Sequence, residues 1–193
     1  MTTLKAVKRD MNVKAKALRR QGKITGNVYG KDMTESIPIQ FSAKETKQFL
    51  NTHTKGSQAI LDLEGQKINV LLKDVTYDPM SRQYYNIDFQ MLVEGEKVIS
   101  SVPILLLNPE NAVGFLTHHL SEISYKAMPS ALIEKVEIDV GKLKAGTILT
   151  VGDLDMAKNE RIELITPPDT LILHMSEYHG YTKASEEETD ENA

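Results

Sequence analysis

Alternation of apolar and polar side chains predicts short β-strands along most of the chain. Residues 3–8 and 36–41 each alternate with a period of two, which is typical of a strand that buries one face. Pro38 indicates that the second of these strands lies at a sheet edge, because proline cannot donate to a hydrogen-bond ladder. The β-rich runs at 58–64 and 67–76 are separated by a glycine-containing turn and predict a hairpin. Further β-rich runs lie at 83–93, 98–107, 121–127, 135–140 and 171–175.

Two short helices are predicted, both in the first part of the chain. Residues 14–21 carry an apolar stripe that includes Leu18, and the other side chains of this segment are mostly cationic. Ser42 and Glu45 form a capping-box pattern, which predicts a second helix that runs to about Leu50.

The pattern therefore predicts a mainly β protein with short helices, divided into two folded units. The acidic, glycine-containing stretch at 94–96 is the predicted junction, so residues 1–93 and 94–178 form two β-rich domains. Residues 179–193 are predicted to be an acidic, disordered tail. Five of the last ten residues are acidic, and alanine is the only apolar residue among them.

The charge distribution along the chain is strongly asymmetric. The first 31 residues contain nine Lys or Arg and a single acidic residue, Asp10, whereas the whole chain has a formal charge of −4. The other 162 residues hold 14 basic and 26 acidic side chains. This asymmetry indicates a cationic surface for a polyanion, and nucleic acid is the first candidate because clustered Lys and Arg release the counterions condensed on phosphates. The alternative is a solvated basic face at the start of a domain.

Signals for catalysis, metal binding or cofactor binding are weak. His118 and His119 are adjacent, so on a strand they would point to opposite faces, and no ligand spacing accompanies them. Gly22, Gly26 and Gly30 are better explained by a helix C-cap and strand turns than by a phosphate-binding loop. We therefore expect no enzyme, no metal, no cofactor and no small-molecule substrate. The absence of cysteine, of a long apolar run and of a signal peptide predicts a cytoplasmic protein with no membrane contact.

Several segments carry a resemblance to a known family. The segment LRRQGKITGNVYGKD at 18–32 resembles the N-terminal signature of the bacterial general stress protein Ctc family, the long-form large-subunit ribosomal proteins that bind 5S rRNA. A second match is KDVTYDP at 73–79, followed by NIDFQ at 86–90. The resemblance continues through 136–140, 143–146 and 151–154, so that it covers about residues 3–176.

The resemblance implies a six-stranded, barrel-like N-terminal domain that docks on 5S rRNA, followed by a C-terminal β-rich domain. It implies no catalytic role, a monomer when free, and the large ribosomal subunit with its neighbouring proteins as partners. The chain departs from the family pattern at three places. Thr25 stands where the family has proline, Asn86 stands where it has an RNA-contacting histidine, and Asn12 to Ala15 replace a Gly-Lys-Gly-Ala stretch.

Candidate RNA contacts fall into two chemical kinds. Cations for phosphates and polar groups for bases or sugars are both needed to read structured RNA. Tyr29 offers a ring and a hydroxyl, Asn86 can donate and accept, and Asp88 can accept from a base amino group, although each could also be an ordinary strand residue. The candidate cations are Lys8, Arg9, Lys14, Lys16, Arg19, Arg20, Lys23 and Lys31.

Two other functions remain open from sequence. The departures at Thr25 and Asn86 favour, as an alternative, a stress-linked protein-interaction module whose RNA binding has weakened. A small hydrolase that uses the His118-His119 region would require bound zinc.

Overall fold

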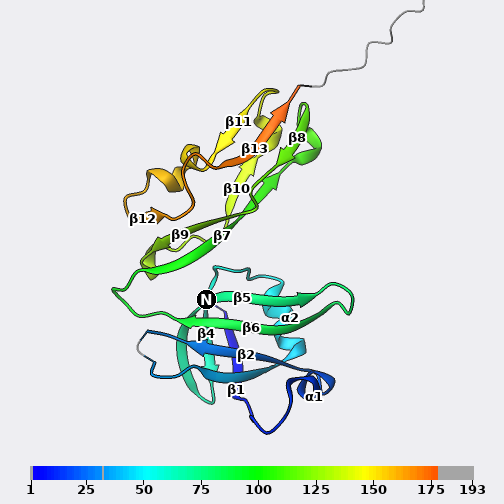
Figure 1. The fold of residues 1–193 in the computed structure, drawn as a ribbon, viewed down its shortest axis with the longest axis vertical. Helices are drawn as coiled ribbons and strands as arrows, with labels where there is room; N and C mark the ends of the chain where they lie inside the picture. Colours follow the sequence, from blue (N-terminus) through cyan, green and yellow to red (C-terminus); the bar gives the residue numbers. More distant parts are fainter. Residues whose placement is uncertain (1, 32, 178–193) are drawn as a thin grey trace, which may run out of the picture.

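The N-terminal part of the chain folds into a closed barrel of six strands (Figure 1). The computed structural model describes residues 2–31 and 33–177, and it is mainly β with short helices, which confirms the predicted fold class. The predicted acidic tail at 179–193 lies outside the described residues. In the part of the chain that the structure describes, no helix has the length and hydrophobicity to cross a membrane.

The barrel strands close in the order β1-β3-β2-β6-β5-β4. The pairs β1/β4 and β2/β6 are parallel, whereas the other four pairs are antiparallel. The strands are β1 (Thr3–Lys8), β2 (Lys23–Tyr29), β3 (Ile37–Ser42), β4 (Gln58–Leu63), β5 (Gln66–Asp78) and β6 (Gln83–Met91). The helices are α1 (Ala15–Arg20) and α2 (Ala43–Leu50), as the sequence predicts.

Alternate side chains of each strand fill the barrel. Ile24 and Val28 of β2 point inward, as do Ile87 and Phe89 of β6, and all four are buried in one hydrophobic cluster. The residues that directly alternate with them, Thr25 and Asn27 on β2 and Asn86 and Asp88 on β6, therefore face outward, because successive strand side chains point to opposite faces. This alternation decides which polar groups of β2 and β6 share the outer surface.

The hairpin between β4 and β5 forms as predicted. Its two central residues, Glu64 and Gly65, both have positive φ, at 53° and 94°. Two positive φ values match the turn that follows the natural right-handed twist of a two-residue hairpin. The Gly65 N–H also donates to Asp62 Oδ1 at 2.9 Å.

The prediction of an edge strand at Pro38 is wrong, because β3 pairs with β1 on one side and with β2 on the other. Arg9 N donates to the Pro38 carbonyl at 2.9 Å. In a strand the N–H and C=O of one residue point the same way. An N–H at position 38 would therefore point, like the Pro38 carbonyl, toward Arg9, which lies just past the end of β1. Closure of the barrel leaves no edge, and proline is tolerated where the neighbouring strand ends.

The interpretation of Gly26 as a turn residue is also wrong. Gly26 lies inside β2, and a Cβ added there would overlap the Ile87 carbonyl oxygen of β6 and lie 2.8 Å from the Phe41 ring. The close approach of β2 and β6 therefore requires glycine. Gly22, in contrast, ends α1 with a φ of 73°, as a helix C-cap should.

The second helix forms without the predicted capping box. The Ser42 side chain makes no capping hydrogen bond. Instead, the Ala43 N–H donates to the Gly22 carbonyl at 2.9 Å, so a tertiary contact satisfies one of the free donors at the helix start.

The C-terminal part forms two small sheets over a second hydrophobic cluster. Their orders are β10-β7-β9-β12 and β11-β13-β8. The strands β8, β11 and β12 are not among the predicted runs, and each has only three or four residues. The strands are β7 (Val98–Leu107), β8 (Phe115–His118), β9 (Glu122–Ala127), β10 (Val136–Asp139), β11 (Ile148–Thr150), β12 (Ile162–Leu164) and β13 (Leu171–Ser176). Short 3-10 helices lie at η1 (Pro109–Asn111), η2 (Pro129–Ala131), η3 (Val140–Lys142), η4 (Val151–Asp153) and η5 (Asp155–Lys158).

The second part packs against the outside of the barrel near β5. Leu71 of β5 lies between two inward-facing neighbours and therefore faces out of the barrel, yet it is also fully buried. Lys73 Nζ donates to the Ile99 carbonyl of β7 at 2.6 Å, and burial, with the nearby charge of Lys55, lowers the Lys73 pKa. A Cβ on Gly56 would overlap the Ser101 carbonyl oxygen, so the two backbones touch there.

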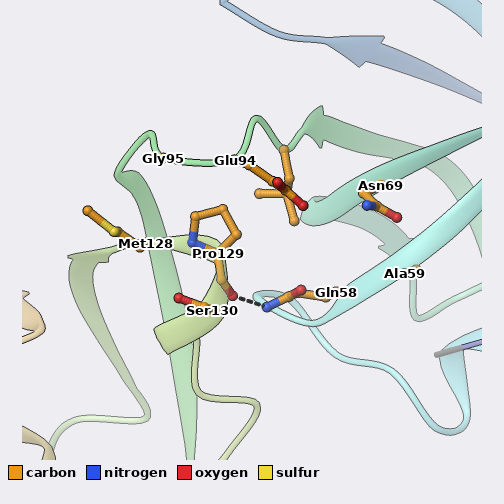
Figure 2. A pocket seen from close by; sticks show the side chains of 9 residues that line it. Gln58, Ala59, Asn69, Glu94, Gly95, Met128, Pro129 and Ser130 are labelled. Carbon is orange, nitrogen blue, oxygen red and sulfur yellow. Dashed lines mark hydrogen bonds between the residues drawn. The ribbon is translucent and has the colours of Figure 1, made fainter.

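A hollow of about 390 Å³ lies beside this contact and is lined by residues of both parts (Figure 2). Gln58 Nε2 donates to the Pro129 carbonyl at 2.6 Å across it, the bond drawn as a dashed line in Figure 2. Close by in sequence, Lys55 Nζ lies 3.4 Å from Glu122 Oε1. The barrel and the second part are therefore joined by polar contacts as well as by the chain.

Candidate nucleic-acid interface

Polar side chains of β2 and β6 form one outward-facing patch on the barrel. The parallel register pairs Thr25 with Asn86 and Asn27 with Asp88. Tyr29 is the next outward-facing residue along β2 and is 37% exposed. We call these five residues, Thr25, Asn27, Tyr29, Asn86 and Asp88, the polar face.

Hydrogen bonds hold the carboxylate of Asp88 in place on the polar face. Asn27 Nδ2 donates to Asp88 Oδ1 at 3.0 Å, and Asn86 Nδ2 donates to the same oxygen at 2.9 Å. Thr25 Oγ1 donates to the Tyr85 carbonyl at 3.1 Å and lies 3.3 Å from Asn86 Oδ1. Both amides donate to Oδ1, and within the described residues no hydrogen bond reaches Oδ2. That oxygen can therefore accept from a ligand.

Two carboxylates influence the hydroxyl of Tyr29. Asp74 of β5 is directly opposite Asp88 in the antiparallel register. Burial, and then the negative charges of Asp88 and Asp74, raise the pKa of the Tyr29 phenol above its usual value. The raised pKa favours the protonated phenol, which can donate a hydrogen bond.

One candidate cation is held by an aromatic ring. The Arg19 guanidinium carbon lies 4.6 Å from the centroid of the Tyr85 ring, within the range of a cation–π contact. The Tyr85 hydroxyl donates to Asp78 Oδ2 at 2.8 Å, as does Ser81 Oγ at 2.6 Å. These hydrogen bonds lower the Asp78 pKa, so the carboxylate that anchors Tyr85 stays ionised.

The other candidate cations are distributed around the barrel. Arg9 is half-buried, and its Nη2 lies 3.4 Å from the Val13 carbonyl. Lys23 is half-buried at the start of β2. Lys31 Nζ pairs with Glu96 Oε1 at 2.8 Å, next to the junction between the two parts. The remaining cations, Lys8, Lys14, Lys16 and Arg20, are exposed.

Sequence reasoning missed three side chains that the fold adds to this region. Asn27 lies within the family signature and alternates with buried residues, so its place on the outer face was available from the pattern. Lys47 and Arg82 line a hollow together with Arg19 and Lys23, and they come from α2 and from the β5–β6 hairpin. No local pattern brings these segments together.

Metal ligands do not gather in the described part of the chain. No group of three or more His, Asp or Glu side chains there could hold an ion.

The closed barrel and the attached β-rich part each match a family of ribosomal proteins. Residues 4–89 match the Ribosomal L25p family, and residues 97–178 match the family described as Ribosomal protein TL5, C-terminal domain. The chain belongs to the bL25 family of large ribosomal subunit proteins, which confirms the resemblance predicted from its motifs.

The relatives match along most of the chain. Large ribosomal subunit protein bL25 of Dictyoglomus thermophilum is 32% identical over 201 residues, covering 98% of this chain and 96% of that protein. The bL25 of Carboxydothermus hydrogenoformans is 31% identical over 175 residues, covering 89% and 86%. The bL25 of Lysinibacillus sphaericus is 31% identical over 159 residues, covering 81% and 79%. A structural role in the large ribosomal subunit follows from this membership.

Proposed function

We propose that this protein is a non-enzymatic constituent of the large ribosomal subunit that binds 5S rRNA through the polar face. The observation that carries the proposal is the geometry of Asp88. Two amides donate to one of its oxygens, and within the described residues the other oxygen has no hydrogen bond and can accept from the RNA. A carboxylate is costly beside phosphates unless it accepts from a specific donor, and the amino groups of bases are such donors.

The cations around the barrel supply the part of the affinity that does not depend on sequence. Lys14, Lys16 and Arg20 are exposed on or beside α1, where they can approach phosphates. Arg19 is held against Tyr85 and thus loses less conformational freedom on binding than a free side chain would. Proteins that read structured RNA usually contact phosphates through cations and contact bases and sugars through polar groups.

We further propose that residues 1–93 form the RNA-binding domain and residues 94–178 the second domain. Two separate hydrophobic clusters support this division. The net positive charge of the first 31 residues also lies on the barrel side, whereas the rest of the chain is acidic. The site of action is the ribosome in the cytoplasm.

Selective binding to 5S rRNA is the direct test of this function. In a gel-shift titration at fixed salt, the full chain should bind 5S rRNA more tightly than it binds a tRNA control. In cell extract, it should sediment with large ribosomal subunits at about one copy per subunit. Equal affinity for both RNAs, together with sedimentation away from the subunits, would favour the protein-interaction module instead.

Binding should weaken steeply with salt. If about four to six cations reach phosphates, the slope of log K against log salt should be on the order of −3 to −5. Arg19→Ala should reduce the magnitude of this slope by about one and weaken binding to all RNAs alike. Lys144→Ala, an exposed charge removal in the second domain, is the matched control and should change neither quantity. A flat salt response would contradict phosphate neutralisation.

A further inference from the structure

A second basic feature lies next to the polar face, at the end of the barrel. A hollow of about 170 Å³ is lined by Arg19, Lys23, Lys47 and Arg82, together with uncharged neighbours. We call these four residues the cationic groove. No carboxylate lines this hollow, and within the described residues none of the four cations makes an ion pair.

The groove is assembled from segments that are distant in sequence. Arg19 comes from the end of α1, Lys23 from the start of β2, Lys47 from the last turn of α2, and Arg82 from the β5–β6 hairpin. Arg82 has a φ of 53°, a left-handed conformation that is uncommon for a residue with a side chain. The barrel thus brings together four cations that no local sequence pattern unites.

The Arg19 side chain is held against an aromatic ring at the groove. Its guanidinium stacks on Tyr85, and its Nε is buried without a hydrogen-bond partner. The nearby acid of the same hairpin, Asp78, accepts from Tyr85 and Ser81 and is therefore already engaged. Within the described residues, an anion that enters the groove would meet cations whose charge no ion pair neutralises.

The same two strands connect the groove to the polar face. Lys23 lies two residues before Thr25 on β2, and Gln83, which also lines the groove, lies three residues before Asn86 on β6. At about 3.3 Å per residue, the groove begins within about 10 Å of the polar face. An RNA strand whose bases or sugars meet the polar face can therefore also place one of its phosphates in the groove.

We propose that the cationic groove binds a backbone phosphate of the same RNA whose bases or sugars meet the polar face. This inference rests on the proposed function and adds Lys47 and Arg82 to the contacts. The phosphate is negative, has two free oxygens, and can accept from more than one of the four side chains at once. The assignment is to a phosphodiester of RNA rather than to a free anion.

The test compares charge-neutral variants of the full chain. Lys47→Gln, Arg82→Gln and the double variant would be titrated with 5S rRNA and with an unrelated RNA duplex at several salt concentrations. Each single change should reduce the magnitude of the salt slope by up to about one, and the double change by no more than about one, because the groove holds a single phosphate. Lys144→Gln, which removes the same charge from the second domain, should behave like the unchanged protein. Circular dichroism would establish that each variant is folded.

The outcomes separate this inference from the proposed function. If the unchanged protein prefers 5S rRNA but the double variant keeps the slope of Lys144→Gln, the groove does not bind phosphate and the proposed function stands. If the unchanged protein binds both RNAs equally but the double variant loses slope, the groove binds RNA phosphate and the 5S assignment fails. Inorganic phosphate should give no saturable NMR shift at the Gly22 and Lys23 amides. Saturation by inorganic phosphate alone would overturn the assignment to RNA.

Discussion

Gly26→Val should destabilise the protein by about 3 kcal/mol or more, because a side chain cannot be accommodated between β2 and β6. A Cβ at this position would overlap the Ile87 carbonyl oxygen, and the Phe41 ring would lie only 2.8 Å away. One of these contacts is with backbone, so relief requires the parallel β2/β6 pair to separate. Unfolding in urea, followed by far-UV circular dichroism, measures the change in the free energy of unfolding.

Gly65→Ala is the control that separates steric overlap from backbone conformation. Gly65 has a φ of 94°, but nothing lies within 4 Å of an added Cβ. The substitution should therefore cost only the penalty of a left-handed conformation, about 1–2 kcal/mol. If Gly26→Val costs no more than Gly65→Ala, the close contact between β2 and β6 is not what makes glycine necessary.

Asp88→Ala should lower the affinity for 5S rRNA by about 1–3 kcal/mol while leaving the affinity for an unrelated duplex nearly unchanged. The substitution removes the oxygen that we propose accepts from the RNA, and it also leaves the Asn27 and Asn86 amides without their shared acceptor. Loss of a base or sugar contact affects only the RNA that offers the matching donor. Parallel titrations of both RNAs at one salt concentration measure the difference.

Asp74→Ala provides a matched charge control for this experiment. Asp74 is opposite Asp88 in the β5/β6 register and is exposed, and none of the described residues donates a hydrogen bond to its carboxylate. Removing it should tighten binding slightly to both RNAs, because one negative charge leaves a surface that approaches phosphates. If Asp88→Ala also tightens binding to both RNAs, Asp88 acts only as a charge and not as a specific contact.

Local pattern was sufficient for most of the barrel. The alternation at 3–8 and 36–41, the hairpin at Gly65 and the basic helix at 14–21 are all confirmed by the structure. These features depend on side-chain period and turn chemistry, which act over a few residues. The strands β11 and β12 were missed because three residues are too few to display a period of two.

The errors at Pro38 and Gly26 share a different cause. A proline in a strand is compatible with an edge, and a glycine between two others is compatible with a turn. Closure of the barrel overrides both expectations, because it gives β3 two neighbours and brings β6 against β2. The capping box at Ser42 does not form, and the Ala43 N–H at the helix start donates instead to the Gly22 carbonyl.

Local sequence predicts some features of the candidate RNA-binding region, and only the fold brings the others together. Sequence alone was enough to predict a basic N-terminal segment and the family, because charge and motif order are local properties. Only the tertiary structure placed Asn27 against Asp88 and joined Lys47 and Arg82 to Arg19. The residues brought together in this way lie 28 to 63 positions apart in the sequence. They depend on which strands pair to close the barrel, and that choice is made by burial of the whole core rather than by any one segment.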